Sequence, residues 1–273
     1  MPKLRIIADD AALRATVTAS STQPGLSVAS LLTDEPMDVH RMIGKSGSYL
    51  LSFAQPELVG GVHFPWTNWS PTATARVRGY SDAGRTQQLS DTGIHPCCPA
   101  SAPQIRGWTA AQVASAYRYG GGAHARAWFA NTAAQYLQID VSDPNNLQGY
   151  LECGRIVVGA WWSPEENADY GATLGQGTAS TPSRNGAGTR RQTIGPKFDK
   201  QSFTLSHLSA SDRATLKGIV RANADAPFIF SLYPDDADAA LERDHQGYFY
   251  AAPSPMAAAG YERYEMSLEL EAV

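Results

Sequence analysis

The best candidate metal ligands of this sequence stand close together as His95, Cys97 and Cys98, with Cys153 much further along the chain. A tetrahedral zinc site usually takes two thiolates separated by about two to four residues, so that both sulfurs reach one ion. Adjacent cysteines lack that spacing. We therefore expect no metal and no cofactor, with Cys153 as a small core residue and the adjacent pair as loop thiols.

Other combinations of reactive residues fall short of catalytic motifs. The G-K-S at 44–46 ends a phosphate-loop pattern, but Val39 occupies the place of its first glycine and no strand precedes it. Glycoside hydrolysis requires two carboxyl groups held at a defined distance from each other. Adjacent acidic residues on a loop, as at 165–166 and 235–236, do not set such a distance. The sequence contains no nucleophile elbow, zinc-protease helix or redox C-x-x-C. It therefore predicts a protein that is not an enzyme.

The aromatic stretch FPWTNWSP at 64–71 is the best candidate for a contact surface. Exposed tryptophans stack on sugar faces and anchor protein interfaces, whereas buried ones fill the core. Trp66 and Trp69 are therefore candidate glycan or interface contacts. Core packing at a corner of the fold is the alternative, and it is the more common fate of large aromatic side chains.

The composition narrows the class of protein. The 273 residues include 22 Lys and Arg against 26 Asp and Glu, a formal net charge of −4. Nucleic-acid binding needs a concentrated basic face, so we expect no sequence-specific nucleic-acid binding. Three cysteines cannot form a disulfide framework and fit a reducing compartment. No window reaches the about 20 apolar residues of a membrane span, so we expect synthesis in the cytoplasm and no membrane span.

Short strand patterns separated by turns fill the first half of the chain. With 24 Gly and 17 Pro, the composition favours a β-sandwich over a helical bundle. Candidate strands lie at 3–7, 15–20, 48–54, 58–64, 74–81, 127–130 and 135–142.

A turn at Asp143–Asn146 separates the strand pattern at 135–142 from a second one at 150–159, which predicts a hairpin-like chain reversal. The second strand is expected to close the sandwich by long-range pairing. Gly149 frees the chain to enter the second strand. Residues 82–107 are predicted to form a long loop, followed by a short helix at 109–120.

The second half of the chain has a different amino-acid composition. Residues 171–196, here called the arm, are dense in Gly, Ser and Thr and predict an extended arm or flexible loop. Ser209 and Asp212 resemble a capping box and predict a helix at about 209–223. Strand patterns follow, and the C-terminus alternates apolar residues with glutamates. We therefore expect a sandwich domain at 1–162 and a β-rich domain with one packed helix at 163–273.

Three segments carry a resemblance to known groups of proteins. In the first half, SVASLLTDEPMDVHRM (27–42) resembles the opening of galactose-binding-like, discoidin-type sandwiches. Two further segments are similar to minor proteins of the tail tip of long-tailed bacteriophages. One contains Asn68, Ser70, Ala73, Thr74, Arg76 and Arg78, and the other, from Ile139 to Gly159, matches the pattern I-D-x-D-P-x-N-x-x-G-Y-x-E-x-G-R-x-x-x-G nearly position for position.

The resemblance implies a mainly β fold, in which a galactose-binding-like jelly roll precedes a β-rich, tail-tube-like domain. It also implies a non-enzymatic structural component of a tail tip or baseplate, of the distal-tail or minor tail protein kind. Such a protein would form a ring of copies of itself and bind tail tube, tail hub and tape-measure proteins. It would be located in the virion after assembly in the host cytoplasm.

The arm and the tryptophans support different functions. The arm carries Arg184, Arg190 and Arg191 and could become ordered across an interface between copies. The alternative function is a carbohydrate-binding adhesion module that presents Trp66 and Trp69 to a bacterial surface glycan. A saturable glycan site would favour the second function, and self-association alone would favour the first.

Overall fold

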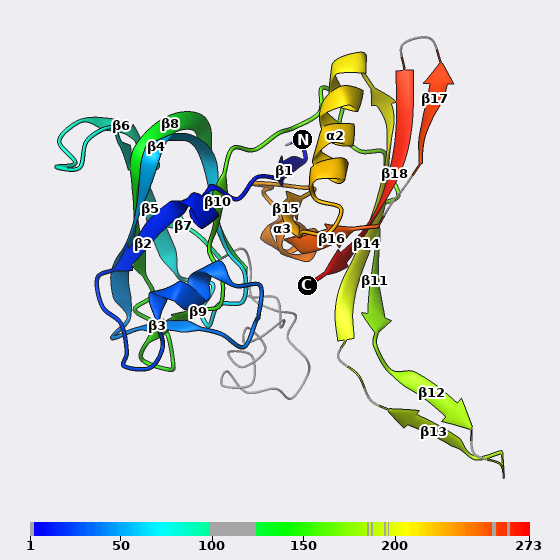
Figure 1. Cartoon of the computed structure of the whole chain (residues 1–273), viewed down its shortest axis with the longest axis horizontal. Coiled ribbons are helices and arrows are strands. Elements are labelled where there is room, and N and C mark those ends of the chain that lie inside the picture. Colours follow the sequence, from blue (N-terminus) through cyan, green and yellow to red (C-terminus); the bar gives the residue numbers. More distant parts are fainter. Residues whose placement is uncertain are drawn as a thin grey trace. The chain divides into compact units, whose positions relative to one another are not determined.

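A computed structural model describes residues 3–98, 124–184, 186, 188–193, 195, 197–252, 255–260 and 263–273. The predicted helix at 109–120 and the end of the predicted loop lie outside these residues. The chain divides into two compact units, one of residues 1–163 with 228–247 and one of residues 164–227 with 248–273. Strands dominate both units, so the expected mainly β fold with an N-terminal sandwich is confirmed (Figure 1).

Unit 1 is built around two long antiparallel strands, β4 (Ser46–Phe64) and β8 (Ala125–Ser142). Their register shifts between Ser52 and Glu57, where a bulge or irregularity interrupts the pairing. Such an interruption bends strands, and in Figure 1 both strands arch over at one end of the unit. The bend lets one strand pair line two sides of the same core.

The remaining strands of the sandwich extend this sheet or close its end. The sheet runs β10-β4-β8-β5-β6, with β2 paired to β4 and β7 paired to β5. The strands and 3-10 helices are β2 (Ala15–Ala19), β3 (His40–Met42), β5 (Thr74–Tyr80), β6 (Gln88–Asp91), β7 (His95–Pro96), β9 (Leu151–Cys153), β10 (Val157–Gly159), η1 (Ala11–Arg14) and η2 (Val28–Leu32).

The core of unit 1 follows from the alternation of apolar side chains along these strands. Along β8, Leu137, Ile139 and Val141 are buried and share the interior with Leu51 of β4 and Val77 of β5. Because successive residues of a strand point to opposite faces, the polar residues between them lie on the outer face. The period-2 pattern thus identified this strand correctly.

The two strand patterns at 135–142 and 150–159 do not pair with each other, and the second pairs with segments distant in sequence, as expected. The turn itself exists, since the Asn146 N–H donates to the Asp143 carbonyl, and Gly149 has a φ of 81°. However, β8 pairs with β4 and β5, whereas β9 pairs with β3. Local turn chemistry therefore predicted the chain reversal but not the partners, which are distant in sequence.

Unit 1 also contains a segment from the second half of the chain. It holds β15 (Phe228–Ser231), which pairs with β1 (Arg5–Ile7), and the short helix α3 (Ala239–Asp244). The observed division therefore departs from the contiguous halves expected at 1–162 and 163–273, because residues 228–247 group with the first unit.

An ion pair within unit 1 joins this returning segment to the sandwich. Arg126 donates from Nε and Nη2 to the two carboxylate oxygens of Glu242, at 2.7 and 2.6 Å. The Glu242 side chain is 1% exposed and that of Arg126 11% exposed. Glu242 also accepts the Asp235 N–H, and Arg126 donates to the Pro96 carbonyl. The pair is bidentate and buried, so each charge depends on the other.

Unit 2 is a sheet with one long helix. Its strands pair in the order β16-β18-β14-β11, and β17 pairs with β18. The elements are β11 (Thr173–Thr178), β12 (Thr181–Arg184), β13 (Arg190–Thr193), β14 (Lys197–Leu208), α2 (Ala210–Ala222), β16 (Gln246–Ala251), β17 (Met256–Gly260) and β18 (Arg263–Ala272). The chain boundary between the units runs through β16.

The helix predicted at 209–223 is confirmed, including its cap. The Ser209 side chain accepts the N–H of Asp212, as the capping pattern predicts. Leu216 is buried, and α2 contacts β14 and β18. Among the described residues, no helix has the length and apolar character needed to cross a membrane.

We expect Glu242→Ala to destabilise unit 1 by about 3 kcal/mol, because Arg126 would stay buried without its carboxylate. All six tryptophans belong to unit 1, so tryptophan fluorescence during urea unfolding reports this unit. Glu35→Ala, a change at an exposed glutamate of the same unit, is the control and should shift stability by less than about 0.5 kcal/mol. Equal effects of the two changes would contradict the role assigned to the ion pair.

Candidate functional site

The two segments that carry the tail-tip resemblance meet in unit 1. One contains Asn68 and Ser70, between β4 and β5, and the other contains Asp143 and Asn146, after β8. Hydrogen bonds join them directly. Asn146 Nδ2 donates to the Asn68 carbonyl at 3.1 Å, and Asn68 Nδ2 donates to the Tyr150 carbonyl at 3.0 Å. The motif residues therefore form one network.

The Asp143 carboxylate is the centre of this network. It is fully buried and accepts the Ser70 N–H at 2.7 Å and the Ser70 hydroxyl at 2.6 Å. A buried carboxylate requires such donors, because it has lost its hydration. Asp143 therefore ties the loop before β5 to the end of β8, a structural role rather than a catalytic one.

Asn68 extends the network to β9. Its Oδ1 accepts the Glu152 N–H at 2.8 Å, and its Nδ2 also donates to Gln148. The Glu152 carboxylate is 2% exposed and accepts from Arg41, whose guanidinium lies 4.0 Å from the centroid of the Tyr150 ring. Each side chain thus satisfies polar groups of another loop.

The last part of the motif is also explained by packing. Arg155 is almost fully buried and pairs with Asp10 at 2.7 Å and with Asp34 at 3.1 Å. A Cβ on Gly154 would lie 3.3 Å from the Trp66 ring, tighter than ordinary contact. These positions hold the loops at this end of the sandwich.

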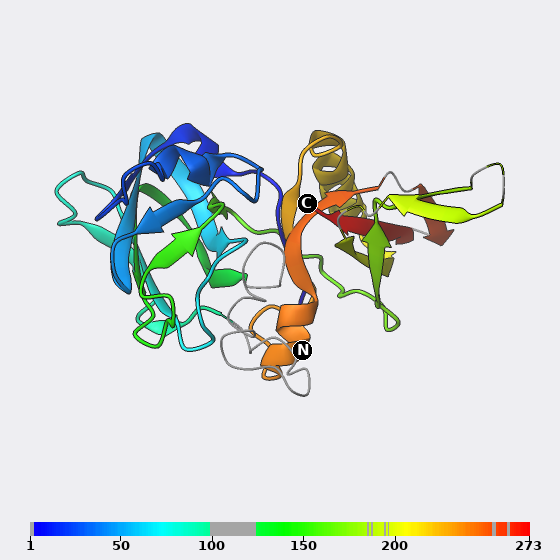
Figure 2. The same cartoon turned by 90° about the horizontal axis from the view of Figure 1, so that it is seen from below.

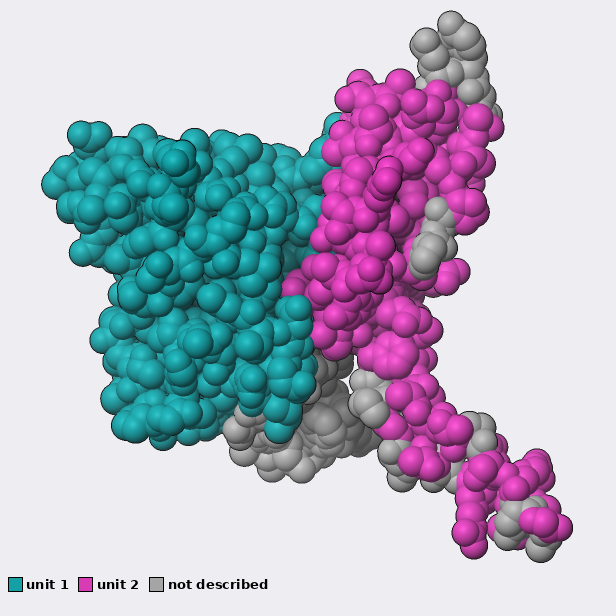
Figure 3. Space-filling view, in the orientation of Figure 1, with its two compact units in different colours: residues 1–163, 228–247 teal, residues 164–227, 248–273 magenta. Residues whose placement is uncertain are grey.

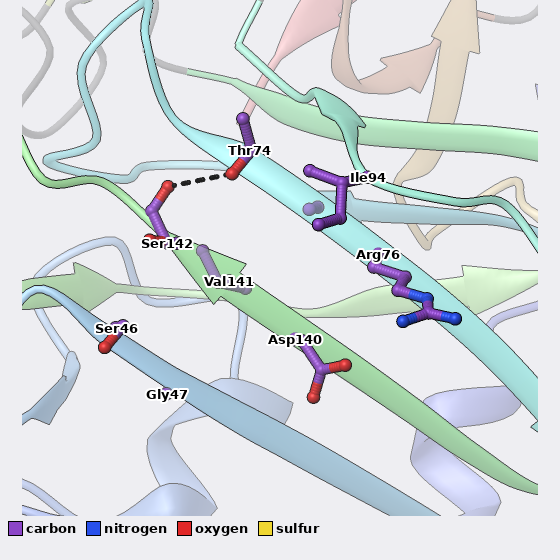
Figure 4. Close-up of a pocket in the computed structure, with 9 residues that line it drawn as sticks. Ser46, Gly47, Thr74, Arg76, Ile94, Asp140, Val141 and Ser142 are labelled. Carbon is purple, nitrogen blue, oxygen red and sulfur yellow. Dashed lines mark hydrogen bonds between the residues drawn. The ribbon is translucent and has the colours of Figure 1, made fainter.

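Arg76 and Arg78 of β5 form ion pairs with acidic side chains of neighbouring strands or loops. Arg76 binds both oxygens of Asp91, and Arg78 donates to Asp140 on β8. These pairs lie beside a shallow depression of about 290 Å³ on the outer face of the sheet, which Figure 4 shows. It is lined by Ser46, Gly47, Thr74, Ala75, Arg76, Ile94, Asp140, Val141 and Ser142. Its charged side chains, Arg76 and Asp140, are already bound in ion pairs with Asp91 and Arg78. The depression therefore contains no charged group that is available for a reaction.

The two candidate tryptophans have different environments. Trp69 is fully buried in the core against Phe64, with ring centroids 4.9 Å apart, so it cannot contact a glycan at the surface. Core packing is therefore the correct interpretation of Trp69. Trp66 is half-buried and adopts a left-handed φ of 58°, which is unusual for a large residue. Both share one aromatic stretch, so sequence could not separate them.

The cysteines are buried and free. Burial raises the pKa of the Cys153 thiol well above its usual value, and the Cys97 thiol together with burial does the same for the pKa of Cys98. Since the thiolate is the reactive and metal-binding form, these thiols are poor nucleophiles and poor ligands. Within the described ranges, no three His, Cys, Asp or Glu residues are grouped to hold a metal ion.

Sequence reasoning missed a buried histidine pair in unit 1. His63 Nδ1 and His124 Nε2 lie 3.0 Å apart, and the His63 ring packs edge-on against Trp128 at a centroid distance of 4.3 Å. Burial lowers the pKa of His63 well below its usual range. Burial and the Arg126 charge lower the pKa of His124 to about 3. Alternation along β4 puts Val62 and Phe64 in the core and His63 on the opposite face, so the sequence pattern gave no sign of this pair.

The described residues of the arm form the strands β11, β12 and β13. Six residue pairs join β11 to β14, from Thr173–Ser202 to Thr178–Lys197. Beyond them, β12 pairs with β13, with Arg184 directly opposite Arg190 and Ser183 opposite Arg191. All three arginines are exposed, and Arg184 donates to the Gly188 carbonyl. The arm has few apolar side chains that could stabilise a fixed structure. Backbone hydrogen bonds between its strands stabilise the hairpin in their place.

Comparison with known proteins finds likeness in structure only. No protein-family model matches the chain, and no curated protein matches it in sequence. Similar solved structures include the lectin domain of lectinolysin complexed with Lewis B antigen, at 13% identity and a TM-score of 0.37, covering 55% of this chain and 95% of that one.

Two other sugar-binding modules show a similar degree of likeness. A chitosan-binding module from a chitosanase/glucanase of Paenibacillus sp. IK-5 is 14% identical, with a TM-score of 0.37 and coverage of 56% of this chain and 99% of that one. A fucose-binding module of Streptococcus pneumoniae is 10% identical, with a TM-score of 0.37 and coverage of 55% and 94%. Likeness at this level carries no information about what this chain binds.

We expect Asp143→Ala to destabilise unit 1 by about 2–4 kcal/mol, because the Ser70 N–H and hydroxyl lose a buried acceptor. Asp143→Asn keeps one acceptor oxygen and should cost less. The exposed neighbour Asn145, changed to alanine, is the control. Urea unfolding followed by tryptophan fluorescence measures the three values, and an Asp143→Ala effect no larger than the control would contradict the central role of this carboxylate.

We also expect unit 1 to lose stability as the pH falls below about 6.5. Burial lowers the pKa of His40 to about 4, and the pKa values of His63 and His124 are lower than usual as well. The unfolded chain therefore takes up protons that the folded chain does not, and each such histidine costs up to about 1.4 kcal/mol per pH unit. Burial raises the pKa of Asp10 to about 6, so the folded chain takes up a proton there between about pH 6 and 4. This proton uptake cancels the loss of stability caused by one histidine over that range.

The measurement is the free energy of unfolding between pH 7 and 4.5. His40→Gln should reduce the loss of stability by up to about 1.4 kcal/mol per pH unit. The control is His207→Gln, which should leave the loss of stability of unit 1 unchanged. His207 belongs to unit 2, and 53% of its side chain is exposed. Constant stability of unit 1 across this range would show that the histidines protonate freely in the folded state.

Proposed function

We propose that this chain is a non-enzymatic structural component of a bacteriophage tail tip or baseplate, in the role of a distal-tail or minor tail protein. In this proposal copies of the chain form a ring that links the tail tube to the hub. Tail tube, hub and tape-measure proteins are the other proposed partners. The protein would be assembled in the host cytoplasm and would reside in the virion.

The observation that supports this proposal best is the shape of the arm. Its tip, residues 179–196, continues from β11 and β14 as a second two-stranded hairpin, and it is the outermost part of unit 2 in both cartoons (Figure 1, Figure 2). In the space-filling view the tip stands away from the body of its unit (Figure 3). A two-stranded ribbon with polar, exposed side chains buries little apolar surface, so it contributes little to the stability of its own chain.

The charges of the arm tip point to a partner. Arg184 and Arg190 are directly opposite across the strand pair, an arrangement in which like charges repel. The arm contains no acidic residue. A partner that supplies carboxylates would remove this repulsion, which gives the arm a reason to bind across an interface.

The motif network of unit 1 is consistent with a structural role. Asp143, Asn68, Glu152 and Arg155 hold four loops at one end of the sandwich through buried hydrogen bonds and ion pairs. Such a network makes the sandwich rigid. A ring closes only when each subunit keeps a fixed orientation to the next, so a rigid subunit favours closure.

The test is to remove the arm tip while keeping the sheet. Thr178 and Lys197 are directly opposite in the register, so a two-residue Asn-Gly turn can replace residues 179–196 and close the hairpin. We expect less than about 1 kcal/mol of change in the stability of the monomer, because the tip packs on little else. We expect loss of self-association in sedimentation velocity and loss of rings in electron micrographs.

Normal ring formation by this variant would show that the arm is a passive loop and would contradict the role given to the arm, whereas a wild-type chain that forms no rings would contradict the proposed function. The same preparation should be applied to a glycan array. Saturable glycan binding by a chain that stays monomeric would favour the alternative, an adhesion module in which the half-buried Trp66 contacts the sugar.

A further inference from the structure

The sheet of unit 2 has one apolar face and one polar face. The apolar face is buried and lies toward α2, with Phe203, Leu205, Met266, Leu268 and Leu270. The residues between them alternate to the other side, called here the outer face. The outer face consists of Lys200, Ser202, Thr204, Glu265, Ser267, Glu269 and Glu271.

The outer face carries hydroxyls and carboxylates in register. Thr204 and Ser267 hydroxyls lie 2.9 Å apart, and Ser202 bonds to Thr173 of β11 at 2.6 Å. Lys200 is paired with Glu271. Neither Glu265 nor Glu269 has an ion-pair partner within 4 Å among the described residues, although Arg263 begins the same strand.

Unit 2 separates its charges between the arm and the rest. Over residues 164–170, 197–227 and 248–273 it has ten Asp and Glu against six Lys and Arg, a net charge of −4. The arm carries three arginines and no acidic residue, a net charge of +3. The two parts of one unit are therefore electrostatically complementary.

We infer that the outer face of unit 2 is the docking surface for the arm tip of a second copy of this chain, with Arg184 and Arg190, which share one face of the ribbon, bound by Glu265 and Glu269. This inference rests on the proposed ring assembly and names its interface. The hydroxyls of Ser202, Thr204 and Ser267 supply donors and acceptors for the Ser, Thr and Gln side chains of the arm.

The arm tip docks on another copy because it cannot reach the outer face of its own unit. The tip continues the direction of β11 and β14 away from the part of the sheet that holds Thr204 and Ser267 (Figure 1). Binding of one patch to a different patch on the next copy is a heterologous contact, and such contacts generate rings when the rotation closes.

Charge reversal tests the pairing directly. The face variant is Glu265→Arg with Glu269→Arg, the arm variant is Arg184→Glu with Arg190→Glu, and a third chain combines all four changes. Each two-residue variant should weaken self-association at least tenfold in sedimentation velocity, and the combined variant should recover most of it, because the opposite charges meet again. Glu35→Arg with Asp225→Arg, two exposed acids away from the face, is the control and should associate normally.

The outcomes separate the inference from the proposed function. Self-association that depends on the arm arginines but not on Glu265 and Glu269 would overturn this docking surface and leave ring assembly standing. A combined variant as weak as either parent would also overturn it. A wild-type chain that remains monomeric at every concentration would overturn both proposals.

Discussion

The buried carboxylate of Asp143 is the constraint around which the end of the sandwich is organised. A charge at zero exposure must be surrounded by donors, and Ser70 supplies two of them from a loop that follows β4. Once these two loops are fixed, Asn68 is positioned to bond Glu152, and Glu152 to bind Arg41. The residues that resemble a tail-tip motif are thus explained as a polar scaffold, which accounts for their types and spacing without any reaction.

A polar scaffold of this kind has consequences for the surface. Because the carboxylates and arginines of unit 1 bind one another, few charged groups there remain for a partner, as the pairs Arg76–Asp91 and Arg78–Asp140 illustrate. The arm of unit 2 is the opposite case, since Arg184 faces Arg190 across the ribbon. The part of the chain with unbalanced charge is therefore the part that we assign to assembly.

Sequence patterns predicted the local features and missed the distant ones. Alternation identified the strand at 135–142, and Ser209 with Asp212 identified the start of α2, because both signals depend only on neighbouring residues. The partner of β9 and the return of residues 228–247 to unit 1 depend on contacts between distant segments. Composition also gave no sign that the arm would pair with itself, because backbone hydrogen bonds need no apolar side chains.

The central claim is that the arm is an assembly element, and amide hydrogen exchange of the full chain at low and high protein concentration tests it most directly. The account predicts that residues 181–193 exchange fast in dilute solution and become protected as concentration rises, together with the β14 and β18 strands of the outer face. Exchange of residues 181–193 that is equally fast at all concentrations, in a sample that forms rings, would contradict the account.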